Sequence, residues 1–341
     1  MPSRTGPFRV LWVSDSAELR AQAAPLFASG LLVSVRPGTT ASRMLDAVLD
    51  QRPDVAVVDL SSGDAAYGAI EAVMAERPTP ILVLHRAGSQ AEAFRALALG
   101  ALDVTELPSQ AGESYWRDLA HRLMLLAQVR VVQHVRGKKR RRNGAPEPRG
   151  NGPTFPLIAI AASLGGPKAL AQLLSMLPRE LSAPVCICQH ISDGFTVGLA
   201  HWLHAETGHA VVEAKDGELL EPGTIYVAPS RYHFRVVAPG RVELDGGPPI
   251  QGFRPSCDVL LDSVARAFGH RAIGVILTGM GRDGAFGLRA IRDRGGRTIA
   301  QDEATCVVYG MPREAVLIGA AEVVLPLEKI ASTLVRWVDE C

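Results

Sequence analysis

The sequence predicts an α/β protein made of two doubly wound units with parallel sheets. Apolar runs of strand length alternate with segments that carry apolar residues at helical spacing, along nearly the whole chain. The alternation is interrupted between residues 131 and 155, where basic residues, glycine and proline replace it. We therefore expect one domain over residues 1–130, a linker over 131–155 and a second domain over 156–341.

The first domain is expected to hold a five-stranded parallel sheet, because each apolar run is followed by a helical pattern. The expected strands are 8–14, 31–35, 55–59, 81–85 and 102–105. The expected helices are one that ends near residue 29, then 40–51, 67–76, 92–99 and 115–130.

The second domain is expected to hold a mostly parallel sheet of the same doubly wound kind, with one hairpin. The expected strands are 157–162, 183–189, 211–214, 224–229, the hairpin 233–237 with 241–244, then 272–277, 298–300 and 322–325. The expected helices are one that begins at Pro167, then 195–205, 257–268, 285–294, 312–318 and 327–338.

Composition limits the classes of function. A net charge of +1 over 341 residues argues against a general nucleic-acid-binding protein. No apolar run reaches the roughly 18 residues that span a bilayer, and no secretory pattern is visible, so we expect a cytoplasmic protein with reduced cysteines. Cys186 and Cys188 share one face of an apolar strand and are expected to be small buried side chains. The basic run 138–142 is expected to be a solvated part of the linker.

Three strand ends of the second domain carry the residues that a serine esterase needs. Ser163 ends the first apolar strand, His190 ends the next, and Asp283 lies in a glycine-rich loop after a third. Because the carboxyl ends of parallel strands meet at one edge, we expect these side chains to lie together. An imidazole can take the serine proton, and a carboxylate can orient the imidazole. A Ser-x-Gly-Gly turn alone also fits a helix cap or a phosphate site, so the prediction rests on all three residues.

This domain resembles the catalytic domain of the CheB-type chemotaxis methylesterases. The motifs that carry the resemblance are residues 162–166 (ASLGG), 190–196 (HISDGFT), 228–233 (APSRYH), 254–258 (RPSCD), 277–284 (LTGMGRDG) and 300–303 (AQDE) followed by 309–312 (YGMP). The resemblance implies a catalytic triad of Ser163, His190 and Asp283. It implies hydrolysis of glutamyl γ-methyl esters with release of methanol, and glutamine deamidation by the same intermediate, without a metal.

The resemblance also implies an oxyanion or substrate site at Leu164, Gly165 and Met280. Two departures from the family pattern stand beside the serine, because Ala161 replaces a usual glycine and Leu164 replaces a usual threonine. We expect these changes to lower the activity or alter substrate choice rather than abolish it. Asp258 and Arg254 are expected to organise the start of the helix near Val259.

The first domain resembles a response-regulator receiver. The residues that carry this resemblance are 13–16 (VSDS), 53–60 (PDVAVVDL) and 100–108 (GALDVTELP). Asp59 falls on the family's phosphoacceptor position, and Asp15 is a weak candidate for holding Mg²⁺, which would be needed only for phosphorylation. One carboxylate of the usual acidic pair is Ser14 here, and Leu107 and His85 replace the usual lysine and hydroxyl residue. These changes predict a degenerate receiver that is not phosphorylated by the usual route.

The resemblance implies partners as well as chemistry. Methyl-accepting chemotaxis receptors would present their cytoplasmic helices as substrate, and a chemosensory histidine kinase would be the partner of the receiver. Neither nucleic acid nor membrane insertion is expected. The alternative is a non-catalytic or weakly active binding module of a chemosensory pathway, whose receiver acts without phosphorylation.

Overall fold

The computed structural model describes residues 7–17, 21, 26, 31–36, 40–86, 90–129 and 155–341. By its contacts the chain divides into two units, Met1–Lys138 and Lys139–Cys341. Most of the helix expected before residue 29, and nearly all of the expected linker, lie outside the described residues. Among the described helices, none is long and apolar enough to cross a bilayer.

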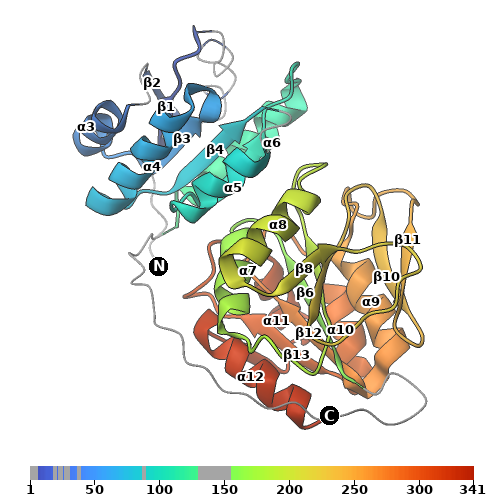
Figure 1. Ribbon diagram of the computed structural model, residues 1–341. Helices are drawn as coiled ribbons and strands as arrows, with labels where there is room; N and C mark the ends of the chain where they lie inside the picture. Colours follow the sequence, from blue (N-terminus) through green and yellow to red (C-terminus); the bar gives the residue numbers. More distant parts are fainter. Residues whose placement is uncertain are drawn as a thin grey trace. The chain divides into compact units, whose positions relative to one another are not determined.

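The first unit contains the predicted five-stranded parallel sheet, with the order β2-β1-β3-β4-β5 (Figure 1). The chain runs outward from β1 to β2 in one direction and from β3 to β5 in the other. The carboxyl ends of β1 and β3 therefore border the crevice where such sheets bind ligands. The strands are β1 (Arg9–Val13), β2 (Leu32–Arg36), β3 (Val55–Asp59), β4 (Ile81–His85) and β5 (Asp103–Glu106).

Helices cover this sheet as the sequence predicts. Strands β3 and β4 are buried along their whole length, whereas the edge strand β2 has no fully buried residue. Trp12 of β1 packs against Trp116 of α6, with ring centroids 6.3 Å apart. The described helices are α3 (Ala41–Gln51), α4 (Asp64–Glu76), α5 (Gln90–Ala98) and α6 (Glu113–Leu126). Helix α4 begins three residues before its predicted start, directly after Gly63, and α6 ends before its predicted end at residue 130.

The second unit is built on a seven-stranded sheet with the order β14-β13-β12-β6-β7-β9-β8, parallel throughout. The order reverses between β6 and β12, so the loops after these two strands meet at the switch point of the sheet. The strands are β6 (Leu157–Ala162), β7 (Val185–Gln189), β8 (Ala210–Glu213), β9 (Thr224–Val227), β12 (Ala272–Ile276), β13 (Arg297–Gln301) and β14 (Val323–Leu325).

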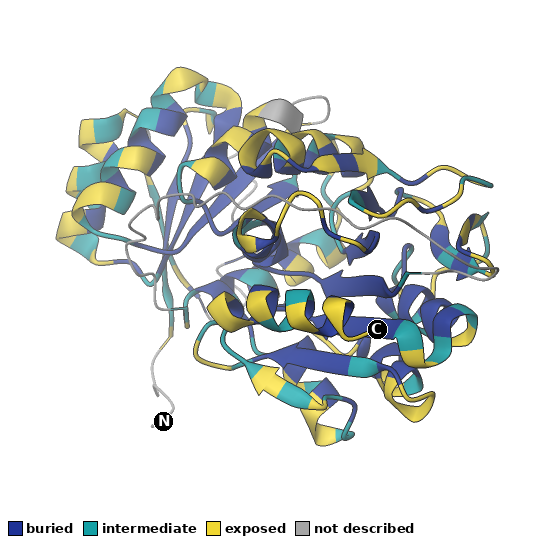
Figure 2. Cartoon of the chain, turned by 60° about the horizontal axis from the view of Figure 1, so that its bottom comes forward, coloured by how far each residue is buried: buried dark blue, intermediate teal, exposed yellow. Residues whose placement is uncertain are grey.

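Two groups of helices enclose this sheet (Figure 1). Right-handed crossovers in opposite directions place α7 and α8 on one face and α10 and α11 on the other. Helix α12 packs on α7, and α9 packs on α10. Figure 2 shows the strands buried and the outward sides of the helices exposed. The helices are α7 (Gly166–Met176), α8 (Thr196–Thr207), α9 (Cys257–Phe268), α10 (Ala285–Asp293), α11 (Met311–Leu317) and α12 (Leu327–Asp339).

The predicted hairpin is present as the antiparallel pair β10 (His233–Val237) and β11 (Arg241–Asp245). It lies outside the seven-stranded sheet and packs against α9. The apolar residues Phe234, Val236 and Val242 turn inward and join the core around α9. The hairpin thus covers one side of the helix that begins at the candidate site.

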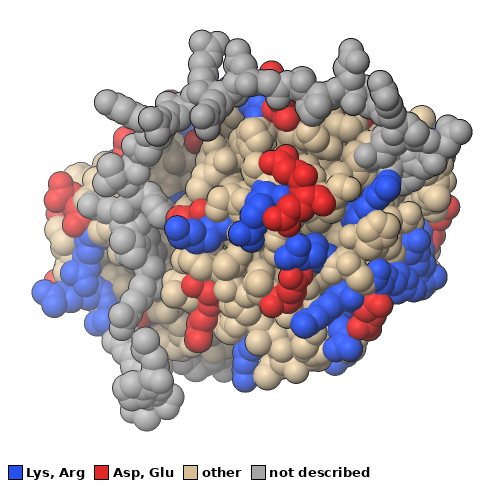
Figure 3. Space-filling view, turned by 90° about the horizontal axis from the view of Figure 1, so that it is seen from below, with Lys and Arg blue, Asp and Glu red and all other residues tan. Residues whose placement is uncertain are grey.

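Charged side chains of both signs are interspersed on the face shown in Figure 3. Several arginines of the second unit pair with acids: Arg297 lies 2.8 Å from Glu322 and 3.6 Å from Glu340, and Arg289 lies 2.7 Å from Asp293.

The close approach of α9 and α10 depends on Gly287. A Cβ atom there would lie 2.6 Å from Leu261 Cβ and 2.8 Å from the carbonyl oxygen of Asp258. We expect Gly287→Ala to lower the free energy of unfolding by about 1–3 kcal/mol, because the two helices must move apart. Urea denaturation followed by tryptophan fluorescence measures the change.

The matched control is Gly246→Ala in the same unit, where the nearest atom to a new Cβ lies 3.7 Å away on Tyr232. That variant should keep the stability of the parent chain within about 0.5 kcal/mol. Equal stability of the two variants would contradict the packing argument.

Candidate active site

Ser163 stands in the turn between β6 and α7, at the point where the sheet order reverses. The turn requires glycine at positions 165 and 166, because a side chain at either would collide with neighbouring residues. Gly165 has φ of +74°, and a Cβ there would lie 2.5 Å from Val307 Cβ. A Cβ on Gly166 would lie 2.0 Å from Gln189 Oε1. The turn therefore admits no side chain at either position without moving its neighbours.

His190 stands beside Ser163 because β6 and β7 are in register. Ala162 is paired with Gln189. The backbone N–H of the next residue, His190, donates to the carbonyl oxygen of Ala162 at 3.0 Å. The buried Gln189 amide then donates to the carbonyl oxygens of Ser163 and His190, at 2.8 Å each. One side chain thus ties the two strand ends together.

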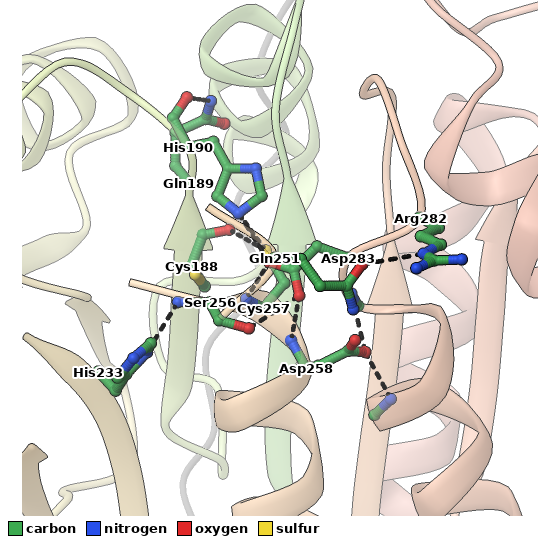
Figure 4. A network of polar contacts seen from close by, with 12 residues as sticks. Cys188, Gln189, His190, His233, Gln251, Ser256, Cys257, Asp258, Arg282 and Asp283 are labelled. Atoms are coloured by element: carbon green, nitrogen blue, oxygen red, sulfur yellow. Dashed lines mark hydrogen bonds and ion pairs between the residues drawn. The ribbon is translucent and has the colours of Figure 1, made fainter. Parts of the chain in front are cut away.

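The structure brings His190 and Asp283 into direct contact, with 2.8 Å between Nε2 and Oδ2 (Figure 4). An ionised carboxylate can only accept, so the imidazole proton lies on Nε2. The other ring nitrogen, Nδ1, is buried and has no hydrogen-bond partner among the described residues. Phe253 stacks on the ring, with centroids 3.9 Å apart and planes 1° apart. The imidazole is thereby held in one orientation, and Nδ1 is left available as a base.

Asp283 is fixed by the amino-terminal end of α9. Its carboxylate accepts from Ser256 Oγ at 2.8 Å, from Cys257 N at 2.7 Å and from Asp258 N at 3.0 Å. Burial raises the pKa of this carboxyl, but His190 and the two backbone N–H groups outweigh burial and hold the pKa below its usual range. Asp283 therefore stays ionised, as a partner of the imidazole must.

Asp258 of α9 makes the reciprocal contact with the start of α10. Its Oδ1 accepts from the backbone N–H groups of Gly284 and Gly287, at 2.9 and 2.8 Å, at the start of α10. The expectation that Asp258 organises its own helix start is therefore wrong, because the two helix ends face each other and exchange carboxylates. Burial and the nearby charge of Asp283 raise the pKa of Asp258 to about 6.

The expectation for Arg254 is also wrong. Its Nη1 donates to the carbonyl oxygens of Gly246 and Gly247 at 3.1 and 2.8 Å, so it holds the loop after β11 rather than the helix start. The helix start is held instead by His233, whose Nδ1 accepts from Ser256 N at 3.2 Å. His233 is buried, and its role here is to hold the helix start.

Backbone donors surround the serine. Within the described part of the chain, the N–H groups of Leu164, Gly165 and Met280 donate to no protein acceptor. Gly279 lies directly against the serine, since a Cβ there would come within 2.9 Å of Ser163 Cβ. Met280 follows it immediately. These free N–H groups are of the kind that stabilise a developing oxyanion.

The serine hydroxyl itself makes no hydrogen bond to any described residue, His190 included. Ser163 is 8% exposed, so its hydroxyl remains at the surface of the site. Catalytic hydrogen bonds are often long in a free enzyme and tighten when substrate binds. The arrangement offers a nucleophile, an imidazole paired with a carboxylate, and backbone donors, which is the set required for acyl transfer.

Sequence reasoning missed Phe253, Gln189 and Ser256, which hold the catalytic groups by stacking and hydrogen bonds. Gln189 is adjacent in sequence to His190, and Ser256 lies within the motif 254–258; these were the only signals they gave. Phe253 lies in a loop with no distinguishing pattern.

The candidate phosphoacceptor of the first unit accepts three hydrogen bonds from hydroxyl and backbone donors. Asp59 is 2% exposed, and it accepts from Ser14 Oγ at 2.8 Å, from Ser61 N at 3.0 Å and from Ser61 Oγ. Asp15, the Mg²⁺ candidate, accepts from Ser62 Oγ at 2.8 Å. Both oxygens of Asp59 are thus engaged by the chain itself.

Comparisons with known proteins show the family of the chain. The family model described as CheB methylesterase matches residues 158–334. The protein-glutamate methylesterase FrzG of Myxococcus xanthus is 55% identical, over 98% of this chain and 99% of its own. A protein-glutamate methylesterase/protein-glutamine glutaminase of Anaeromyxobacter dehalogenans is 46% identical, over 96% of each chain.

Among solved structures, the CheB methylesterase catalytic domain of Thermotoga maritima is 40% identical. It covers 54% of this chain and 99% of its own, with a TM-score of 0.53. The family model matches more than half of the chain, and relatives align over nearly its whole length. The chain therefore belongs to the CheB methylesterase family.

Proposed function

We propose that the protein hydrolyses glutamyl γ-methyl esters on the cytoplasmic helices of chemotaxis receptors, with Ser163 as nucleophile, and releases methanol. The observation that carries this proposal is the bond of 2.8 Å between His190 and Asp283 at a strand end in register with Ser163. The names of the relatives, protein-glutamate methylesterases, support the substrate class. Because the proposed substrate is the cytoplasmic part of a receptor, we also propose that the enzyme acts in the cytoplasm.

In the proposed mechanism Ser163 Oγ attacks the ester carbonyl while His190 Nδ1 takes its proton. Asp283 keeps the other imidazole proton on Nε2 and stabilises the imidazolium that forms. The N–H groups of Leu164, Gly165 and Met280 bind the oxyanion, a contribution of about 3–4 kcal/mol per donor in other hydrolases. His190 then returns the proton to departing methanol, and water cleaves the acyl-enzyme by the same steps.

The same intermediate is formed when a glutamine amide replaces the ester, with ammonia as leaving group. A relative named for both activities supports deamidation as a second reaction of this site. The triad supplies the base and the carboxylate, so we propose that neither reaction needs a metal or another cofactor.

The decisive test is methanol release from a purified, methylated receptor fragment. Ser163→Ala should lower the rate by about 10³-fold or more, because the nucleophile is lost. Ser332→Ala is the matched control, since Ser332 is an exposed serine of α12 that bonds only within its own helix. It should release methanol at the parent rate.

Equal rates in Ser163→Ala and the parent chain would contradict the proposed nucleophile. Absence of methanol release from the parent chain, with binding to the receptor retained, would favour the alternative of a non-catalytic binding module.

The rate should depend on pH through His190. Burial disfavours the charged imidazole, but the hydrogen bond to the ionised Asp283 favours it, and the pKa of His190 is raised above its ordinary value. The base must be neutral, so kcat/KM should fall about tenfold per pH unit below that pKa and level off above it. We expect the midpoint in metal-free buffer to lie above 6.5.

Asp283→Asn removes the charge that favours the imidazolium. Its residual activity should therefore show a midpoint at lower pH than the parent chain, at a rate reduced by about 10⁴-fold at most. A parent midpoint at or below 6.5 would contradict the assignment of the base.

We also propose that the first unit is a degenerate receiver that acts without phosphorylation. Both oxygens of Asp59 are engaged by serine donors, and the lysine of the family is replaced by the buried Leu107. Mg²⁺ would be required only if Asp59 were phosphorylated. Control of the esterase then falls to a partner that binds this unit, with a chemosensory histidine kinase as the candidate.

Incubation with Mg²⁺ and a small phosphodonor should therefore leave Asp59 unlabelled when the intact mass is measured. A receiver protein with the full acidic pair and lysine is the positive control. Stable, Mg²⁺-dependent addition of one phosphoryl group that is lost in Asp59→Asn would contradict the proposal.

A further inference from the structure

Two cysteines flank the catalytic histidine in a way that the esterase mechanism does not use. Cys188 lies near the end of β7, and Cys257 is the first residue of α9. Both are buried, and the sulfur of Cys257 lies 3.5 Å from His190 Nε2 (Figure 4). One ligand atom from each of Cys188, His190 and Cys257 lies within 4.8 Å of the other two. These residues come from segments about seventy positions apart, so the fold assembles the group.

The separation between Cys257 Sγ and His190 Nε2 fits a tetrahedral metal. Zinc bonds of about 2.3 Å to sulfur and about 2.0–2.1 Å to nitrogen place neighbouring ligand atoms roughly 3.5–3.8 Å apart. The observed separation of 3.5 Å between Cys257 Sγ and His190 Nε2 lies in this range. Hard cations such as Mg²⁺ prefer oxygen ligands, so a sulfur and imidazole set selects zinc-like ions.

The charges also balance at such a site. In the metal-free chain Cys257 carries its thiol proton, which it donates to the carbonyl oxygen of Cys188 at 3.5 Å. Binding of a divalent ion would release the thiol protons of Cys188 and Cys257 to solvent. A divalent cation with two thiolates has no net charge, which is the form that a buried site tolerates.

We propose that Cys188, His190 and Cys257 form a binding site for Zn²⁺, with one coordination position open, and that occupation of this site inhibits the esterase. The site rests on the geometry alone, whereas the inhibition rests on the proposed function.

Inhibition follows from the tautomer of the imidazole. The proposed catalysis needs the proton on Nε2, which contacts Asp283, and the lone pair on Nδ1 to accept the serine proton. A metal bound at Nε2 requires the lone pair there, so a neutral ring must carry its proton on Nδ1. His190 can then no longer accept the serine proton, and its bond to Asp283 is lost.

Cobalt is the probe that tests the site without any activity. Titration of the metal-free full chain with Co²⁺ should give thiolate-to-cobalt charge-transfer bands and the intense visible bands of a tetrahedral ion. Zn²⁺ should abolish these bands by displacement and release two protons per ion bound in weakly buffered solution.

The variants Cys188→Ala and Cys257→Ala should each lose the charge-transfer bands or weaken Zn²⁺ binding at least tenfold. Loss of an outer partner of a metal ligand already costs about 10–100-fold in other sites. Cys186→Ala is the matched control, because Cys186 is an equally buried cysteine of the same strand that lies outside the cluster. It should bind cobalt as the parent chain does.

Absence of cobalt bands in the parent chain would overturn the site, as would bands that persist when both Cys188 and Cys257 are alanine. Zn²⁺ should also lower methanol release in the parent chain and in Cys186→Ala, with recovery on addition of a chelator. Cobalt binding with undiminished methanol release in zinc would overturn the inhibition alone. A metal-free chain that releases no methanol would instead overturn the proposed function, and the cobalt titration would still decide the site.

Discussion

The exchange of carboxylates between α9 and α10 is the interaction on which the candidate site depends. Asp283, just before α10, accepts the first N–H groups of α9, while Asp258 of α9 accepts N–H groups at the start of α10. Each helix end carries unsatisfied donors and a partial positive charge, so each favours a carboxylate. The exchange locks the position of Asp283, and through the bond of 2.8 Å it locks the imidazole of His190. Gly287 permits it, because only a residue without Cβ lets the two helices come this close.

Both units of the chain place an aspartate at the carboxyl side of a central strand, but they use it in opposite ways. Asp283 directs one oxygen to a side chain that can change its protonation state, and it stays poised because burial is offset by hydrogen bonds. Asp59 gives its oxygens to Ser14 and Ser61, which are uncharged and cannot exchange with a phosphoryl group. The same position in a doubly wound sheet thus holds an aspartate paired with an imidazole in one unit and an aspartate bonded to serines in the other.

The sheets, and the strand ends that carry Ser163, His190 and Asp283, could be predicted because apolar runs followed by turn residues are local signals. The contacts that hold those three residues in place could not be predicted. The carboxylate exchange joins residues about 25 positions apart, and nothing near Asp258 indicates which helix end it meets. The fit of Ala161, where the family usually has glycine, also depends on a residue distant in sequence. Its buried methyl group faces Gly284, which has no side chain and therefore leaves room for it.

The two roles proposed for His190, as a base and as a metal ligand, place opposite requirements on the same ring nitrogen. Asp283 requires a proton on Nε2, whereas in the proposed site with Cys188 and Cys257 a metal would require the lone pair of the same nitrogen. Only one of the two can be satisfied at a time, so the choice of tautomer is a choice between an active and an inactive site. Together with the proposal that Asp59 is not phosphorylated, a device of this kind would place control of the enzyme inside the catalytic unit itself, in competition between a proton and a metal ion for one ring nitrogen.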